Sequence, residues 1–268
     1  MRSRRWCTSI VGTLALALVS TSVRASAAQA PGTERRVALP TGVEIRYVES
    51  GRPGGETVVF LHGYTDSSLS FGPTIEALLA RRPDLRTLAP DLRGHGGSSL
   101  PPAEECAADP APCFRVAEFA RDVLAFLDAV DVERAHLVGH SYGSLVAQDV
   151  ALAAPDRIAS IVLLGSTARA VGNPVIEGFV LGELVEGKWK PALEARDVEW
   201  PADAYDVTPL EIDPAIEEWL LANWVTEIAA EPAYLAELAA GTARVPVGAW
   251  LGVARAALGF DNVARLEG

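Results

Sequence analysis

Short, almost continuously apolar runs alternate with helical segments along this chain, and this alternation limits the possible folds more than any other feature. The runs Thr57-Val58-Val59-Phe60-Leu61 and 158–164 are nearly free of polar side chains. Strands of this kind are typical of sheets that are covered on both faces. The helical stretches between the runs are long enough to cross a sheet, so we expect an α/β fold with a mostly parallel, doubly wound sheet.

Six strands and about three crossover helices are predicted. We expect the first two strands to form an antiparallel hairpin around Pro40-Thr41-Gly42. Apolar residues recur on one helical face over 116–130, and a second helix is expected over 144–153. The strands are expected at roughly 36–39, 44–49, 57–61, 86–89, 135–138 and 158–164.

After about residue 168 the strand pattern stops and the chain becomes helical and acidic. Asp213-Pro214 is typical of a helix start, and further helices are expected over 233–239, ended by Gly241, and over 246–258. We interpret residues 34–168 as the core of the fold and residues 169–268 as an inserted helical cap.

Composition and charge exclude a nucleic-acid-binding protein. The 268 residues carry 23 basic against 35 acidic side chains, a net charge of −12, and no basic cluster. Because phosphate neutralisation needs clustered Lys and Arg, nucleic acid is not an expected partner. A hydrophobic fraction of 49% with 22% charged residues indicates a globular protein of one domain, with or without an insertion.

The first thirty residues have the features of an export signal. Three arginines within the first five residues precede an apolar stretch over 6–19, and Ala25-Ser26-Ala27 follows. We expect a signal peptide over residues 1–27 and a secreted or periplasmic protein, with an uncleaved anchor as the alternative. No later run of about 18 apolar residues occurs, so no membrane span is expected in the mature chain.

Two cysteines of the mature chain, Cys106 and Cys113, lie close together in a loop rich in Pro and Ala. In an oxidising compartment we expect them to form a disulfide, worth about 2.5 kcal/mol by the entropy of a short closed loop. Two free thiols are an alternative. A metal site is another, but it has no neighbouring His or third Cys to complete it.

The run Gly139-His140-Ser141-Tyr142-Gly143 carries the strongest chemical signal. It follows a predicted strand and opens a predicted helix. The two glycines permit a sharp turn that exposes the Ser141 hydroxyl, and the helix N-terminus offers N–H groups to a developing oxyanion. An ordinary Gly-rich turn is the alternative, and two further motifs argue against it.

Both further motifs follow predicted strands at the same sheet edge. His62-Gly63-Tyr64-Thr65-Asp66 follows the strand over 57–61, so we expect the Tyr64 N–H to join that of Tyr142 in holding the oxyanion. The Gly-rich turn over 91–98 follows the next strand and contains His95. Ligands of such sheets bind at this edge.

These three motifs, in this order and spacing, resemble the α/β-hydrolase superfamily over nearly all of residues 36–168. Within it the chain is similar to small esterases, lactonases and perhydrolases with a helical cap after the sixth strand. The resemblance implies an eight-stranded sheet, a Ser, Asp and His triad with Ser141 as nucleophile, and no metal or organic cofactor. A serine at this turn also argues against the epoxide hydrolase and haloalkane dehalogenase branches, which use a carboxylate nucleophile.

The chain departs from that family in its histidines and its acid. The triad partners should follow the nucleophile in chain order, yet all four histidines precede Ser141. We assign each a structural role: His62 in the oxyanion loop, His136 at the far end of its strand, and His140 on the buried side of its strand. His95 is the best substitute base, because its loop is expected to face the site.

The expected acid is missing too, since residues 166–170 contain no carboxylate and no seventh or eighth strand is recognisable. We therefore expect a C-terminally truncated chain that lacks roughly 60 residues by the family resemblance and ends before strand seven. Its strand over 158–164 would then have an unpaired edge. Without a general base, only the oxyanion hole and binding contribute, leaving about 10³ to 10⁴ of rate over water.

The leading hypothesis is a serine hydrolase that acts on a carboxylic ester or lactone, with little activity in this chain. The alternatives are a non-catalytic binding protein that keeps the pocket, and a carbon–carbon bond hydrolase or perhydrolase using the same triad. The acidic cap disfavours anionic substrates. No oligomeric state is predicted.

Overall fold

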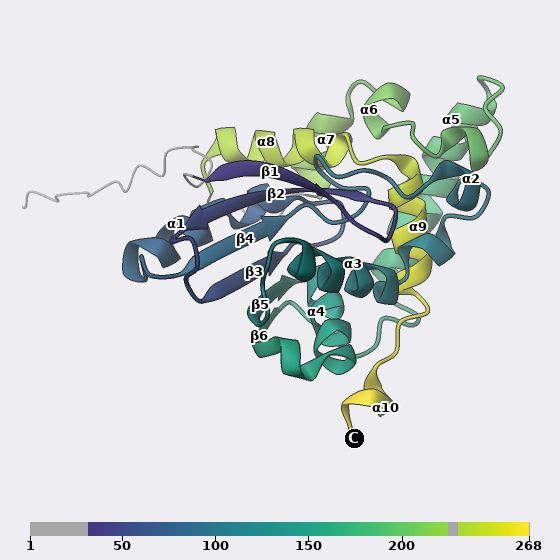
Figure 1. Cartoon of the computed structure of the whole chain (residues 1–268). Helices are drawn as coiled ribbons and strands as arrows, with labels where there is room; N and C mark the ends of the chain where they lie inside the picture. The colour runs from purple at the N-terminus through teal and green to yellow at the C-terminus, as the bar shows by residue number, and fades with distance from the viewer. Residues whose placement is uncertain (1–31, 225–229, 268) are drawn as a thin grey trace, which may run out of the picture.

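A computed structural model describes residues 32–224 and 230–267 of the chain. Six strands form one sheet in the order β1-β2-β4-β3-β5-β6, with helices on both faces and a layer of helices along its upper edge (Figure 1). The predicted α/β fold class is confirmed. The expected export signal over residues 1–27 lies outside the described residues.

The strands of the sheet are β1 (Thr33–Ala38), β2 (Glu44–Gly51), β3 (Thr57–Leu61), β4 (Arg86–Pro90), β5 (Ala135–His140) and β6 (Ile158–Leu164). Pairs β1–β2 and β2–β4 are antiparallel, and the remaining pairs are parallel. The hairpin predicted around Pro40-Thr41-Gly42 is present, and the predicted bounds of β3 and β6 agree residue for residue.

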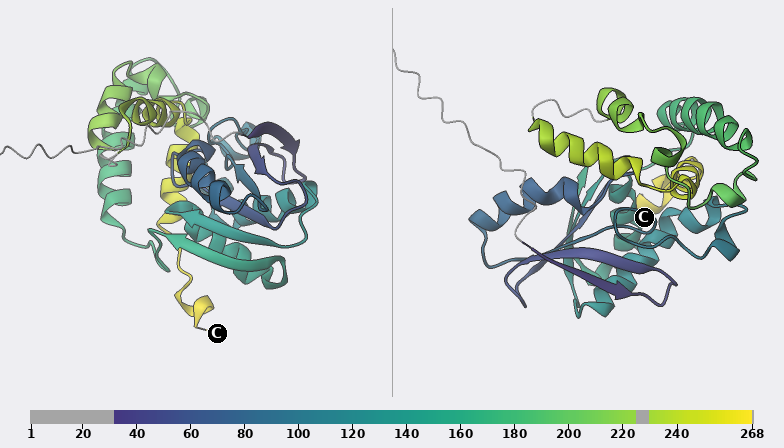
Figure 2. Two further views of the ribbon diagram at one scale, coloured as in Figure 1. Left: turned by 90° about the vertical axis from the view of Figure 1, so that its left-hand side faces the viewer. Right: turned by 90° about the horizontal axis from the view of Figure 1, so that it is seen from above.

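The helices are α1 (Gly72–Arg81), α2 (Ala103–Cys106), α3 (Val116–Ala129), α4 (Tyr142–Ala153), α5 (Lys190–Glu194), α6 (Pro209–Ile212), α7 (Ile216–Asn223), α8 (Pro232–Ala243), α9 (Val247–Ala257) and α10 (Val263–Leu266). Short 3₁₀ turns are η1 (Ser68–Phe71), η2 (Ala111–Phe114), η3 (Pro155–Arg157) and η5 (Ala202–Ala204), and η4 (Val175–Trp189) winds as a π-helix. We call residues 175–224 and 230–257 the helical layer. Figure 2 shows this layer standing over one edge of the sheet.

Alternate residues of β3 face two different cores, which explains why its sequence lacks a polar face. Val59 and Leu61 pack with α3 and α4 in the larger core. Val58 and Phe60 pack with α1 in a smaller core around Phe71. Because both faces are covered, every side chain of this strand is buried.

Strand β6 corrects the prediction that its apolar run is covered on both faces. It lies at the edge of the sheet, and Ile161, Val162, Leu163 and Leu164 keep between 38% and 47% of their surface exposed. Within the described residues no strand pairs with its outer edge. An exposed apolar edge of this kind favours edge-to-edge association.

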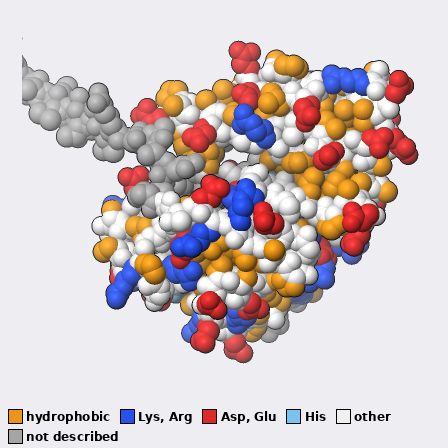
Figure 3. All heavy atoms as spheres, turned by 45° about the horizontal axis from the view of Figure 1, so that its top comes forward, with side chains coloured by type: hydrophobic (Ala, Val, Ile, Leu, Met, Phe, Trp, Pro, Cys, Tyr) orange, Lys and Arg blue, Asp and Glu red, His pale blue; other side chains and the backbone are white. Residues whose placement is uncertain are grey.

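The helical layer contains two further departures from the sequence predictions. Gly241 does not end a helix, because α8 continues to Ala243. The helix expected from Asp213 begins at Ile216, and the Asp213 side chain accepts a hydrogen bond from the Ala215 N–H at 3.0 Å. Segment η4 was not predicted. Figure 3 turns the top of the molecule forward and shows acidic side chains scattered among apolar ones.

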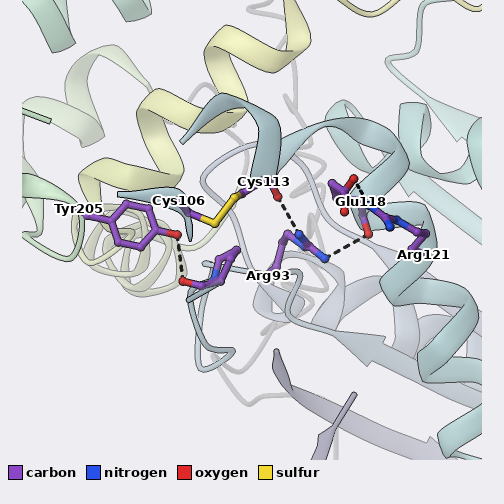
Figure 4. The surroundings of a disulfide bond; sticks show 7 residues. Arg93, Cys106, Cys113, Glu118, Arg121 and Tyr205 are labelled. Carbon is purple, nitrogen blue, oxygen red and sulfur yellow. Dashed lines mark hydrogen bonds and ion pairs between the residues drawn. A yellow bond between two sulfur atoms is a disulfide. The ribbon is translucent and has the colours of Figure 1, made fainter. Parts of the chain in front are cut away.

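Cys106 and Cys113 form a disulfide, with 6.0 Å between their Cα atoms. Figure 4 shows that Arg93 reaches from the turn after β4 toward this loop. Its Nη1–H donates to the Cys113 carbonyl at 2.7 Å, and its Nη2–H donates to the Glu118 carbonyl at 3.3 Å. The disulfide loop is therefore tied to the turn over 91–98.

Candidate active site

Ser141 lies at the point where β5 ends and α4 begins, in a conformation that L-residues rarely adopt. Its φ is 48° and its ψ is −118°. Such a backbone is strained and persists only where the surroundings hold it. The Ser141 N–H donates to the Leu164 carbonyl of β6 at 2.9 Å, and the Ser144 N–H donates to the Ser141 carbonyl at 2.9 Å.

The two glycines of this turn are required by close backbone approach. A Cβ at Gly143 would lie within 3.0 Å of the carbonyl oxygens of Leu61 and His62. A Cβ at Gly139 would lie within 3.0 Å of the Gly143 carbonyl and of the Ser144 Cα. Real Cβ atoms do not approach backbone this closely. The turn can therefore close on the start of α4 only with glycine at 139, and it can pack against the end of β3 only with glycine at 143.

We call residues 63–66 the oxyanion loop. A Cβ at Gly63 would lie 3.3 Å from the Ser141 Cβ, so this loop passes directly beside the serine. Tyr64 and Tyr142 line the same cavity as Ser141. Their hydroxyls are engaged elsewhere, at the Trp250 carbonyl (2.6 Å) and the Phe114 carbonyl (2.8 Å). Neither hydroxyl proton is therefore free to bind a ligand in the cavity.

His62 joins the oxyanion loop to the turn after β4. The Leu92 N–H donates to His62 Nε2 at 2.8 Å, so the ring proton lies on Nδ1 and is donated to the Gly63 carbonyl, also at 2.8 Å. The ring is fully buried. With both nitrogens engaged, His62 holds the loop in place and has no free nitrogen for a ligand.

His95 does not face the cavity, which agrees with the structural role predicted for it and rules out the alternative that it serves as a substitute base. It is 2% exposed and is absent from the cavity lining. Its Nδ1 bonds the Arg93 carbonyl at 2.8 Å, and its buried Nε2 has no hydrogen-bond partner. Burial, with the neighbouring His62, lowers the pKa of His95 to about 3. The ring is therefore neutral and packed inside the turn.

His136 and His140 lie at opposite ends of β5. His136 bonds Glu56 through Nε2 at 2.8 Å and Ser160 through Nδ1 at 2.7 Å, far along the strand from Ser141. His140 is exposed, which corrects the prediction that it is buried. Its ring lies beside the oxyanion loop and lines the cavity. Alternation along β5 placed His140 on a buried face, but that face stays exposed here because the neighbouring strand β6 lies at the edge of the sheet, where its own side chains stay exposed.

Two carboxylates near the site have different roles. Asp91 is 1% exposed and accepts the Ser68 N–H at 2.7 Å and the Gly97 N–H at 2.9 Å, so it holds the turn over 91–98 together. Asp66 lines the cavity, and burial raises its pKa. Its Oδ1 accepts the Ser67 N–H at 2.8 Å. Sequence reasoning did not single out Asp66, although it ends the quoted loop motif.

The cavity above Ser141 has a volume of about 940 Å³ and lies between the sheet edge and the helical layer. Among the described residues that line it there is no Lys or Arg. Asp66 is the carboxylate in this lining. The apolar part of the wall includes Phe71, Pro73, Leu145, Leu164, Ala170, Val175, Ile176, Val180, Trp224, Ala230, Leu238, Val253, Ala254 and Ala257.

Within the described residues, no group of three or more His, Cys, Asp or Glu side chains is placed to hold a metal ion. No helix over 32–224 or 230–267 is both long and apolar enough to cross a bilayer.

Known proteins with similar sequences share the fold described above. A family model described as the alpha/beta hydrolase fold matches residues 56–186. Epoxide hydrolase A of Mycobacterium tuberculosis is 37% identical over 136 residues, which are 51% of this chain and 39% of that relative. The chain spans less than half the length of the curated relatives it matches.

Solved structures share the fold over most of the chain. A hydrolase from Pseudomonas aeruginosa PA01 is 25% identical with a TM-score of 0.62, covering 88% of this chain and 76% of its own. The enol-lactonase of Burkholderia xenovorans is 24% identical with a TM-score of 0.61, covering 85% and 74%. Sheet order, the strained serine turn and the family match agree, and the chain belongs to the α/β-hydrolase superfamily.

Proposed function

We propose that Ser141 is the nucleophile of a serine hydrolase that acts on uncharged, largely apolar carboxylic esters or lactones. The observation that carries this proposal is the backbone of Ser141, at φ 48° and ψ −118° between strand and helix, with its side chain in a large cavity. Strain of this kind gathers at functional sites. A turn with only a structural role would not need a serine in this conformation.

In the proposed reaction, Ser141 Oγ attacks the carbonyl carbon and forms a tetrahedral intermediate. The N–H groups of Tyr64 and Tyr142, the latter at the N-terminus of α4, stabilise its oxyanion. The Ser141 hydroxyl proton passes to water during the attack, and collapse breaks the ester carbon–oxygen bond, releasing an alkoxide that takes a proton from water. The acyl group left on the serine is then hydrolysed by a second water molecule. The family resemblance implies that epoxide hydrolases carry a carboxylate nucleophile at this position. Because this chain carries a serine there, we expect its substrates to be esters or lactones and not epoxides.

The first prediction concerns the nucleophile. A neutral alkyl fluorophosphonate is expected to label the purified chain at Ser141, and Ser141→Ala is expected to abolish the adduct, as measured by intact-protein mass spectrometry. Ser160→Ala, on the exposed face of β6, is the matched control and should label like the unchanged protein. No adduct on a folded chain would contradict the proposal.

A non-catalytic binding protein is the second candidate, and the histidines favour it. Among the described histidines, the rings of His62 and His136 are occupied by the hydrogen bonds described above, and His95 is buried outside the cavity. His140, which lines the cavity, makes no hydrogen bond to a described carboxylate that would orient it as a base. Such a protein would bind an uncharged ligand in the cavity without reacting with the fluorophosphonate. The labelling experiment therefore separates the two candidates.

The second prediction concerns substrate charge. Because Asp66 lines the cavity and no described Lys or Arg does, an anionic ligand would meet a repulsive potential there at any pH above the raised pKa of Asp66, where this carboxylate is ionised. A neutral alkyl fluorophosphonate should label Ser141 at least about tenfold faster than a carboxylate-bearing analogue of the same length, a difference of about 1.4 kcal/mol. Replacing Asp66 with Asn should reduce the difference between the labelling rates of the neutral and the carboxylate-bearing probe. Equal rates for the two probes would refute the assigned substrate class.

We also propose that the protein is exported, by secretion or to a periplasm. The basic and apolar N-terminal segment supports this, as does the disulfide between Cys106 and Cys113, because such bonds persist in oxidising compartments.

A further inference from the structure

Three side-chain hydrogen bonds join the helical layer to the oxyanion loop beside Ser141. The Tyr64 hydroxyl donates to the Trp250 carbonyl at 2.6 Å. The Trp224 Nε1–H donates to Thr65 Oγ1 at 3.1 Å, and the Thr242 hydroxyl donates to the Thr65 carbonyl at 3.1 Å. Two consecutive loop residues are thus held by residues 159 or more positions away in the chain.

Thr65 has a backbone that its own sequence disfavours. Its φ is 59°, in the left-handed region, where a β-branched residue is a clear outlier. Glycine or asparagine would adopt this conformation at lower cost. Thr65 is fully buried, and its hydroxyl also donates to the Tyr64 carbonyl at 2.7 Å. Because the local sequence does not favour this backbone, its surroundings maintain it, and the contacts from Trp224 and Thr242 are the ones that come from the helical layer.

The ring of Tyr64 is held from the same side. Its centroid lies 5.3 Å from that of Trp250 and 6.1 Å from that of Trp224, in edge-to-face contacts with interplanar angles of 73° and 78°. The centroids of Trp224 and Trp250 lie 5.5 Å apart. Edge-to-face pairs at these separations add to the stability gained by burial. Tyr64 is therefore held through its side chain and through the residue that follows it.

We propose that the helical layer sets the oxyanion hole, with Thr65, Trp224 and Thr242 acting as positioning residues for the Tyr64 N–H. The catalytic part of this inference rests on the proposed function. None of the three residues needs to touch the reacting atoms, because each acts on the loop that carries the donor. Displacement of the helical layer would release Thr65 from its strained backbone and move the N–H away from the oxyanion.

Removing the two hydrogen bonds to Thr65, while keeping most of the side-chain volume, tests the proposal. The double variant Trp224→Phe with Thr242→Val is compared with Trp219→Phe, the same aromatic change in α7 at a residue outside the cavity lining. Hydrogen exchange, read by mass spectrometry on peptides covering residues 63–67, should become at least about tenfold faster in the double variant. It should stay unchanged in Trp219→Phe.

The kinetics of fluorophosphonate labelling supply the second measurement. Misplacing an oxyanion donor slows the chemical step, so the labelling rate at saturating probe should fall by about tenfold or more in the double variant. Trp224 and Thr242 also line the cavity, so the rate is compared at saturation, where a change in probe binding has no effect. A purely structural role would lower the melting temperature and leave this saturating rate unchanged.

The outcomes separate this inference from the proposed function. Unchanged exchange over residues 63–67 in the double variant overturns the inference, whatever the labelling shows. Faster exchange in a chain that never labels supports the anchoring and contradicts the hydrolase. Should the double variant not fold, Trp224→Phe alone carries the same test, with faster exchange expected and unchanged exchange decisive against the proposal.

Discussion

Replacing Asp122 with alanine is expected to lower the free energy of unfolding by about 3–5 kcal/mol. Asp122 and Arg93 are 4% and 5% exposed, and two guanidinium N–H groups donate to the carboxylate oxygens at 2.6 Å each. Without the carboxylate, the Arg93 charge stays buried and unpaired, since the carbonyls of Cys113 and Glu118 supply only neutral acceptors (Figure 4). Urea denaturation followed by circular dichroism measures the loss.

The matched control for this change is Asp128→Ala. Asp128 pairs with Arg157 at 2.7 Å, but its side chain is 67% exposed. Exposed pairs contribute about 1 kcal/mol or less, so this variant should be nearly as stable as the unchanged protein. Equal losses of unfolding free energy in the two variants would contradict the argument that the Arg93–Asp122 pair stabilises the chain because it is buried.

Replacing Gly143 with alanine is expected to destabilise the chain by about 3 kcal/mol or more and to abolish labelling of Ser141. The added Cβ meets the carbonyl oxygens of Leu61 and His62, which belong to backbone that the sheet holds in place. The start of α4 must then move away from β3 and carry Ser141 with it. Thermal unfolding and fluorophosphonate labelling report the two effects.

Gly241→Ala is the matched control, with the opposite sign expected. Gly241 lies inside α8 with open space around its Cα. Alanine in a helix interior is favoured over glycine by about 1 kcal/mol, so this variant should be slightly more stable and label normally. A Gly143→Ala chain as stable as Gly241→Ala would contradict the steric reading of the serine turn.

Most of the sheet could be predicted because its signals are local. Strand β3 shows its burial through a lack of any polar face, and α3 shows its inner face through the spacing of apolar residues. The serine turn was predictable for the same reason, since glycines on either side of Ser141 record a steric demand within five residues.

The predictions that failed depend on neighbours that are distant in sequence. His140 was assigned to the buried side by alternation along β5, but the face beside it stays uncovered because β6 is an edge strand. Segment η4 was missed because its three glycines weaken the helical pattern. His95 was expected to face the site, yet its ring turns into the core near Phe119.

Local patterns were enough to predict the order of the strands, the sharp turn at Ser141 and the two loops that flank it, because periodicity, glycine sterics and strand ends act over a few residues. Three features could be learned only from the folded chain: which histidine shares the cavity with Ser141, that Asp66 lines this cavity, and that Trp224 and Thr242 hold Thr65. Those contacts arise when the helical layer packs on the sheet edge, and the free energy of that packing overrides the local preference of a residue such as Thr65.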